Sequence, residues 1–287
     1  MRHDAKSLLE RARRGRYAVP AFNVSTLEQV RVIAETAARL RAPFIIETSE
    51  GESSLMTYFE AVAVVGGWKR HLRWPIVLNS DHHHSFERVR LAVDSGYTLV
   101  HIDASTLPYD ENVAVTKRVV AYAHRRGVAV EGEIGFIGGG SERHRQVARV
   151  SLEQLTRPAE AVKFVRATGV DILAANLGNL HGLYRGGKPH LAIANLIAIR
   201  RRTRVFLTLH GGSGIPPRDI HRAIDHGITK INVNTELRVA FIGGLRRSFQ
   251  RHPGETTPYK LYPEAMAAMG KVVAEKIRLF RANGRVR

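Results

Sequence analysis

The 287-residue sequence contains no cysteine. It therefore excludes the closed, thiolate-rich sites that hold many structural zinc ions. It says little about the redox compartment, because a chain without cysteine neither gains nor loses disulfides.

Long apolar runs are absent as well. No stretch approaches the roughly 18 apolar residues of a membrane-spanning helix, and the first residues, Met1 to Lys6, are not followed by the apolar segment of a secretory signal. No proline- and serine-rich linker or low-complexity tract divides the chain. We therefore expect a cytoplasmic protein with no membrane partner, folded as a single domain over residues 1–287.

Acidic residues are fewer than basic ones. The sequence has 44 Lys and Arg and 26 Asp and Glu, which gives a formal net charge of +18. Such a charge suits nucleic acid, an anionic surface or a phosphorylated substrate. The basic residues, however, form short dispersed clusters without interleaved aromatic residues or a nucleic-acid motif. The preferred interpretation is a solvated arginine-rich surface, and nucleic acid is not the expected partner.

The sequence does contain three apolar, β-rich runs that each end at a histidine. Each run has the length and β-branched content of a buried strand. A catalytic zinc takes three protein ligands and leaves a fourth position for water or substrate, so three imidazoles at one end of a parallel sheet would form such a site. A lone histidine is more often a surface or core residue, and only the shared position favours ligands. The runs at 75–81, 171–180 and 204–209 lead into His82, His181 and His210.

Strands that alternate with helices are predicted along the whole chain. Four predicted strands follow a glycine suited to the left-handed position after a helix, namely Gly96, Gly127, Gly169 and Gly227. Alternation at this spacing predicts parallel βαβ units, and eight are enough to close a barrel. We therefore predict an α/β fold, a (β/α)8 TIM barrel with an additional C-terminal helix. The predicted strands span 17–23, 43–48, 75–80, 97–103, 128–133, 170–176, 204–209 and 228–232.

Two helix starts are predicted from local signals. Ser25 and Glu28 have the spacing of a capping box at the start of the first helix after a strand. The last helix is expected to begin after Pro263. Its apolar stripe predicts packing against the barrel or a partner subunit, and consists of Met266, Met269, Val273, Ile277 and Phe280.

In such a barrel the carboxyl ends of the strands face one mouth, where the active sites of this fold lie. Asp81, next to His82, is suited either to proton transfer or to orienting a metal ligand. The small-residue turns Gly211–Gly214 and Asn232–Thr235 are of a kind that binds phosphate, although either could be a plain turn. The residues expected around the mouth are Asn23, Ser49, Asp81, His82, Asp103, Ser105, Glu131 or Glu133, His181, His210 and Asn232.

Seven blocks of the sequence resemble, in order, those of class II ketose-bisphosphate aldolases. The resemblance implies zinc-dependent cleavage of a ketose 1,6-bisphosphate to dihydroxyacetone phosphate and glyceraldehyde 3-phosphate through a zinc-stabilised enediolate, as in glycolysis. Fructose 1,6-bisphosphate is favoured over tagatose 1,6-bisphosphate or a related phosphorylated ketose. The resemblance also suggests a homodimer or homotetramer. The blocks are 17–23, 81–82, 102–105, 130–133, 178–182, 209–216 and 230–236.

The resemblance implies a role for each matching residue. Zn²⁺ would be held by His82, His181 and His210, and a second cation by Asp103 and Glu133. Asp81 would be the acid/base at the aldehyde-side oxygen, and Glu142 would exchange the proton at dihydroxyacetone phosphate. The predicted substrate-binding residues are Asn23, Ser49, Gly182, Gly211, Gly212, Ser213, Asn232, Val233, Asn234 and Thr235.

Three positions depart from the family pattern. Asn79 stands where the family usually has the first histidine of His-x-Asp-His, and Asn179 replaces a Ser or Thr. Direct alignment of the mobile loop puts Ser141 at the family's glutamate position, so Glu142 reaches it only with a one-residue insertion. These changes bear on efficiency and substrate identity more than on fold or metal.

Two other functions are compatible with the sequence. Lys230, on a predicted barrel strand, could form a Schiff base with a carbonyl substrate if it were desolvated. The charge of +18 and the altered loop are also compatible with a catalytically impaired barrel that binds polyanions. The first alternative leaves the three histidines unexplained.

Overall fold

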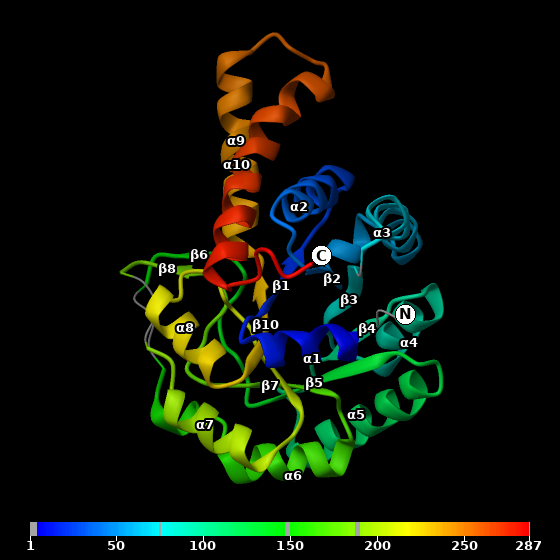
Figure 1. Ribbon diagram of the computed structural model, residues 1–287, viewed down its shortest axis with the longest axis vertical. Helices are drawn as coiled ribbons and strands as arrows, with labels where there is room; N and C mark the ends of the chain where they lie inside the picture. Colours follow the sequence, from blue (N-terminus) through cyan, green and yellow to red (C-terminus); the bar gives the residue numbers. More distant parts are fainter. Residues whose placement is uncertain (1–4, 75, 147–149, 187–189, 287) are drawn as a thin grey trace.

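The computed structural model describes residues 5–74, 76–146, 150–186 and 190–286, and it contains a closed barrel of eight parallel strands (Figure 1). The order of the strands around the barrel is β1-β10-β9-β7-β5-β4-β3-β2. All eight predicted strands are present with slightly different ends, which confirms the predicted TIM barrel. The predicted strand residue Pro75 and the first four residues lie outside the described part. The strands are β1 (Val19–Asn23), β2 (Phe44–Ser49), β3 (Ile76–His83), β4 (Leu99–Ile102), β5 (Ala129–Ile134), β7 (Ile172–Ala175), β9 (Phe206–Leu209) and β10 (Ile228–Val233).

Helices surround the barrel and connect successive strands (Figure 1). The four glycines predicted after helices all have positive φ, at 109° for Gly96, 72° for Gly127, 73° for Gly169 and 107° for Gly227, as the prediction requires. The helices are α1 (Ala5–Gly15), α2 (Leu27–Arg39), α3 (Tyr58–Leu72), α4 (Phe86–Ser95), α5 (Tyr109–His124), α6 (Pro158–Thr168), α7 (Ile193–Arg202), α8 (Pro217–Asp225), α9 (Thr235–Arg251) and α10 (Pro258–Leu279).

Both predicted helix starts are wrong in detail. The N-cap of α2 is Thr26, whose side chain makes no capping bond, and the side chain of Gln29, not Glu28, accepts the N–H of Ser25 at 2.7 Å. Helix α10 begins at Pro258, and Pro263 lies inside it. Pro258 occupies the first turn, where the missing N–H has no partner to lose, whereas Pro263 lies in the second turn and removes one backbone hydrogen bond of the helix.

Helix α1 was not predicted. Its apolar side chains are buried and lie at spacings of three and four residues, on one side of a segment that is otherwise rich in arginine. Because α1 leads directly into β1, it lies at the amino ends of the strands and covers that end of the barrel. The mouth at the carboxyl ends remains open for a site. The buried residues are Ala5, Leu8, Leu9 and Ala12.

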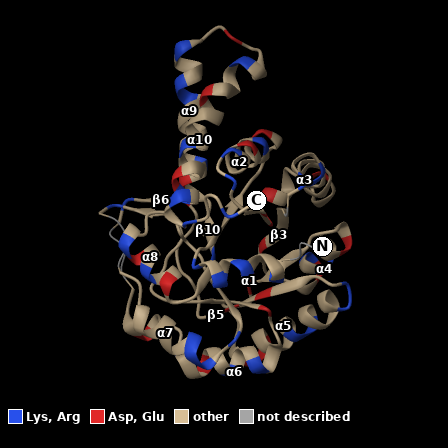
Figure 2. Ribbon diagram, viewed as in Figure 1, with Lys and Arg blue, Asp and Glu red and all other residues tan. Residues whose placement is uncertain are grey.

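Helices α9 and α10 form an antiparallel pair that extends beyond the barrel (Figure 1). Four residues of the predicted apolar stripe, Met269, Val273, Ile277 and Phe280, are buried, so the prediction of a packing face is confirmed. No described helix is sufficiently long and apolar to span a membrane. Lys and Arg lie on the outer helices together with fewer Asp and Glu (Figure 2).

Candidate active site

The carboxyl ends of the strands surround a small cleft. Its lining combines most of the residues predicted at the mouth, from segments far apart in the sequence. Among the predicted site residues, Ser49, Asp103, Glu133, Glu142, Gly212 and Val233 lie beside or behind this lining. The lining residues are Asn23, Asp81, His82, Ser141, His181, Gly182, His210, Gly211, Ser213, Asn232, Asn234 and Thr235.

The three predicted histidine ligands converge in this cleft. The centre of the His82 ring lies 4.8 Å from that of His181 and 4.7 Å from that of His210, and the other two rings are 5.9 Å apart. His82 Nε2 and His210 Nδ1 are separated by 3.0 Å. Two nitrogens bound to one tetrahedral zinc lie roughly 3.3 Å apart, because each Zn–N bond is about 2.0–2.1 Å. The spacing of the His82 and His210 nitrogens therefore fits a shared metal ion, whereas His181 is placed beside them by its ring and is not part of the described groups whose ligand atoms all lie within 4.8 Å of one another.

Carboxylates fix the outward-facing nitrogens of two of these rings. His82 Nδ1 donates to Asp103 Oδ2 at 2.7 Å, and His210 Nε2 donates to Glu131 Oε1 at 2.7 Å. Burial acts to raise the pKa of Asp103, but the hydrogen bond and charge of His82 hold it well below its usual range. Each ring thus points its other nitrogen into the cleft, as in metal-bound histidines whose outer N–H is held by an acceptor. The two facing nitrogens need a shared proton or a cation between them.

His101 belongs to the same cluster, although the sequence analysis did not select it. It is fully buried on β4, and its Nδ1 accepts the N–H of His82 at 3.1 Å. Together with Asp81, His82 and His210 it offers ligand atoms within 4.8 Å of one another. The sequence could have identified His101 as a site residue, because it lies two residues before Asp103 and alternate residues of a strand share a face.

A second group of potential ligands lies behind His82. His82, Asp103 and Glu133 also offer atoms within 4.8 Å of one another, and Ser105 Oγ lies 2.7 Å from Asp103 and 3.0 Å from Glu133. Burial raises the pKa of Glu133 to about 8, with the charge of Asp103 adding to the effect. The buried Glu133 Oε2 has no hydrogen-bond partner in the described part of the chain. Its nearest charged contact is His101 Nε2 at 3.6 Å. A carboxylate oxygen that accepts no hydrogen bond and lies beside a second carboxylate is compatible with a cation.

Asp81 is held between two amides. Asn23 Nδ2 donates to Asp81 Oδ2 at 2.9 Å, and Asn232 Nδ2 donates to Oδ1 at 3.1 Å. Burial opposes ionisation of Asp81, but the charge of His82 and its other cationic neighbours hold its pKa well below the usual range. The next residue, His82, has a φ of 45°, which costs a non-glycine residue roughly 1 kcal/mol or more. This turn of the backbone presents both side chains to the cleft.

Lys230 is unsuited to a Schiff base. It is fully buried, and its Nζ lies 2.9 Å from each of Glu47 Oε1, Glu131 Oε2 and Asn232 Oδ1. Burial would lower its pKa, but the two carboxylates raise it above the ordinary lysine value. A lysine must lose its proton to attack a carbonyl, and this one is held as a cation.

The glycine-rich turn at Gly211 packs too closely for any side chain. Gly211 has a φ of 62°, and a Cβ there would lie 2.0 Å from Leu180 O. A Cβ at Gly182 would lie 2.5 Å from Gly140 O. The N–H of Gly212 donates to Asn232 O at 2.9 Å, which joins this turn to the end of β10. The two predicted phosphate-binding turns therefore meet at the start of α9.

Comparison with known proteins agrees with this geometry. The sequence profile of the family described as "Fructose-bisphosphate aldolase class-II" matches residues 3–285. The chain belongs to this family. The aldolase is 39% identical over 283 residues to the fructose-bisphosphate aldolase of Geobacillus stearothermophilus, and the match covers 98% of this chain and 97% of the relative. Like other class II aldolases, it is a lyase of carbohydrate metabolism, in a class of enzymes that is typically metal-dependent.

Solved structures share the fold of this aldolase. The YdjI aldolase from Escherichia coli K12 matches with a TM-score of 0.85 at 28% identity over 99% of both chains. The fructose-bisphosphate aldolase from Campylobacter jejuni matches with a TM-score of 0.79 over 97% of this chain and 94% of its own, and at 19% identity it supports the fold alone.

Asn79 and Asn179, two residues that depart from the family pattern, both form hydrogen bonds in this aldolase. Asn79 Nδ2 donates to Glu47 Oε1 at 2.7 Å. Asn179 Nδ2 donates to the backbone oxygen of His210 at 3.1 Å, while its Oδ1 accepts the N–H of Leu177 at 2.8 Å. Asn179 therefore steadies the backbone that carries a predicted ligand.

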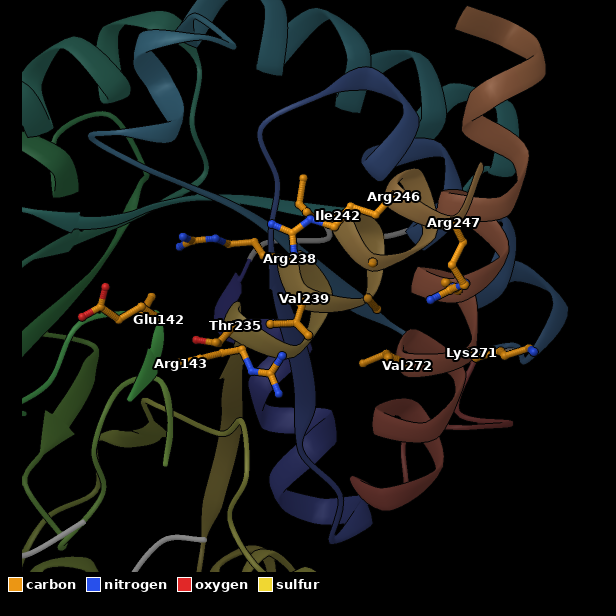
Figure 3. Close-up of a pocket in the computed structure, with 14 residues that line it drawn as sticks. Glu142, Arg143, Thr235, Arg238, Val239, Ile242, Arg246, Arg247, Lys271 and Val272 are labelled. Carbon is orange, nitrogen blue, oxygen red and sulfur yellow. The ribbon is translucent and has the colours of Figure 1, made fainter. Parts of the chain in front are cut away.

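In the loop after β5, Ser141 and not Glu142 lines the cleft. The side chain of Glu142 is 71% exposed and points its Oε1 to within 3.8 Å of His144 Nδ1. It lines a wider groove of about 800 Å³, which shares Ser141 and Thr235 with the cleft (Figure 3). Arg238 and Arg143 lie at the end of the groove nearest Thr235 (Figure 3). The groove gives the neighbourhood of the cleft a positive charge that suits a phosphorylated substrate.

Proposed function

We propose that this aldolase reversibly cleaves a ketose 1,6-bisphosphate, with fructose 1,6-bisphosphate the favoured sugar, to dihydroxyacetone phosphate and glyceraldehyde 3-phosphate. The observation that carries the proposal is the convergence of His82, His181 and His210 on one cleft beside the ionised Asp81. Family membership supports the type of reaction, and the histidine nitrogens in the cleft support the proposed metal ligands. A zinc ion held by the three histidines would polarise the substrate carbonyl.

Asp81 is the proposed acid/base of the carbon–carbon cleavage. As a carboxylate it accepts the proton of the hydroxyl next to the cleaved bond, and in the condensation it returns that proton to the aldehyde oxygen. The Asn23 and Asn232 amides orient it, since each donates to one of its oxygens. Glu142 is the proposed proton-exchange residue at dihydroxyacetone phosphate, which requires its exposed side chain to turn from the groove into the cleft.

The proposed binding site for dihydroxyacetone phosphate combines the two turns that meet at α9. Thr235 is the first residue of α9, so its surroundings carry the partial positive charge of a helix N-terminus. Asn23 and Ser49 are proposed for the other end of the substrate. The proposed turn residues are Gly182, Gly211, Gly212, Ser213, Asn232, Val233, Asn234 and Thr235.

The remaining proposals concern the whole protein. We infer a second cation site at Asp103 and Glu133, a single aldolase domain over residues 1–287, a homodimer or homotetramer, and a cytoplasmic location. The second site is supported by the Glu133 oxygen that accepts no hydrogen bond from the described residues. The other three rest on the family resemblance, on a sequence without a linker, and on the finding that no helix in the described residues could span a membrane.

Side-by-side cleavage of the two sugars tests the proposed function. Release of dihydroxyacetone phosphate from fructose 1,6-bisphosphate and tagatose 1,6-bisphosphate is measured at equal enzyme concentration. We expect the fructose sugar to have the higher kcat/KM. Borohydride added with dihydroxyacetone phosphate should leave activity unchanged, because Lys230 is held as a cation. Cleavage of neither sugar would contradict the proposal.

A further inference from the structure

Glu52 joins three segments at one edge of the cleft. It begins the short 3₁₀ helix Glu52–Ser54 that follows β2. Its Oε2 accepts the Asn23 side-chain amide at 3.0 Å and the Ser49 N–H at 2.8 Å, while its Oε1 accepts the Asn234 side-chain amide at 3.1 Å. These donors come from the ends of β1 and β2 and from the turn after β10. One carboxylate therefore links three separate strand ends.

The three donors that Glu52 engages all belong to the proposed substrate-binding set. A carboxylate can only accept hydrogen bonds, so it fixes the orientation of both asparagine amides. Asn234 directs its nitrogen at Glu52, and its buried Oδ1 has no partner in the described part of the chain. Asn23 donates to Glu52 and to Asp81 through the same nitrogen. The donors are thus directed at protein carboxylates, and an acceptor atom is left over.

The carboxylate of Glu52 disfavours a negatively charged substrate group at this edge of the cleft. Glu52 and Asp81 lie on either side of Asn23, and the charge of Asp81 adds to burial in raising the pKa of Glu52. A phosphate at this edge would approach a carboxylate that already holds the Asn23 and Ser49 donors. A hydroxyl can instead donate a hydrogen bond to a carboxylate oxygen. Glu52 does not line the basic groove, so the groove does not neutralise it directly.

We propose that Glu52 is a specificity-determining residue that shifts the preference of this aldolase towards aldehydes with free hydroxyl groups and away from aldehydes that carry a phosphate. The inference rests on the proposed function, because Asp81 and Asn23 place the aldehyde half of the substrate at this edge. It concerns the relative use of aldehydes and is compatible with cleavage of a bisphosphate. Glu52 acts through the amides that it orients and through its charge.

The test compares two aldehydes in the condensation with dihydroxyacetone phosphate. The kcat/KM for glyceraldehyde 3-phosphate and for glyceraldehyde is measured in the unmodified enzyme and in Glu52→Gln. The glutamine oxygen can accept the Asn23 and Ser49 donors, and its nitrogen can donate to Asn234 Oδ1 after that amide turns over. The variant should therefore fold and carry one negative charge fewer at this edge. We expect the ratio of the phosphorylated to the unphosphorylated aldehyde to rise about tenfold.

Glu50→Gln is the matched control, because it removes the same charge from the same loop. Glu50 accepts the N–H of His84 at 2.9 Å, whereas Glu52 accepts hydrogen bonds from the proposed substrate-binding residues Asn23, Ser49 and Asn234. In Glu50→Gln, the ratio of kcat/KM for the phosphorylated aldehyde to that for the unphosphorylated aldehyde should stay within about twofold of the value for the unmodified enzyme. An unchanged ratio in Glu52→Gln, an equal rise in Glu50→Gln, or a Glu52→Gln protein that circular dichroism shows to be unfolded would each overturn the inference. An unmodified enzyme that uses neither aldehyde would instead overturn the proposed function.

Discussion

At the scale of single residues, the candidate metal site depends on which nitrogen of each histidine is engaged elsewhere. Asp103 and Glu131 accept from the outer nitrogens of His82 and His210, and the inner nitrogens are left facing each other. Both carboxylates remain ionised because cationic neighbours outweigh the effect of burial on their pKa. The orientation of the ligands is therefore built into the folded protein.

Replacement of Asp81 tests its proposed role in proton transfer. Asp81→Asn keeps the size of the side chain but removes the carboxylate, so we expect kcat to fall by about 10²- to 10⁴-fold. Zinc content per chain should be unchanged, because Asp81 is not one of the three proposed ligands. The exposed Asp225, which pairs with Arg281, provides the control Asp225→Asn, and its kcat should match that of the unmodified enzyme. Activity above a tenth of the original in Asp81→Asn would contradict the assignment.

The sequence predicts the position of the three histidines because each closes a recognisable strand. The sequence does not predict a role for Glu52, because its hydrogen-bond partners lie at three strand ends that are brought together only by the fold. His101 could have been found from its spacing to Asp103, but Glu47 and Glu131 could not be assigned to Lys230 without the barrel register. Spacing locates side chains along a strand, and hydrogen bonds between strands need the closed fold.

At the scale of secondary structure, the strands were predictable because glycine and β-branched residues mark them, and helix ends were less so. The boundary of α10 depends on which of two prolines starts the helix, and local sequence did not decide between Pro258 and Pro263. Helix α1 was missed because arginines surround its four buried residues. Strand signals are local, whereas a short amphipathic helix is stabilised mainly by what it packs against.

Gly244 tests how closely α9 and α10 pack. A Cβ at Gly244 would lie 2.4 Å from Ala265 Cα, so Gly244→Ala should force the helices apart and lower the free energy of unfolding by about 2 kcal/mol. The neighbouring Gly243 is the control, because a Cβ there meets only Arg247 Nη1, at 3.5 Å. Gly243→Ala should be neutral or stabilising by up to about 1 kcal/mol. Denaturant unfolding measures both, and equal midpoints for the two variants would contradict the packing account.

At the scale of the whole molecule, the charge of +18 needs an explanation that the fold does not supply. Lys and Arg are spread over the outer helices among acidic residues (Figure 2). A nucleic-acid site would be expected to gather basic residues along one face or groove. The observed distribution favours a solvated surface, with a basic groove beside the active site.

Nucleic-acid binding provides the test of this interpretation. We expect fluorescence anisotropy of a labelled DNA duplex to show weak binding that disappears as the salt concentration rises from about 50 to about 200 mM. The reason is that only non-specific phosphate contacts contribute to the binding. Aldolase activity should be unaffected by the duplex at the higher salt concentration. Tight binding that survives the higher salt would favour the polyanion-binding alternative.

The most direct measurement is the recovery of fructose 1,6-bisphosphate cleavage by zinc after chelation. The account predicts that a chelator abolishes activity, that about one zinc per cleft restores it, and that His181→Ala neither retains zinc on dialysis nor recovers. Activity that persists without metal, or a His181→Ala enzyme that binds zinc and cleaves the sugar normally, would contradict the central claim that these three histidines form the catalytic metal site.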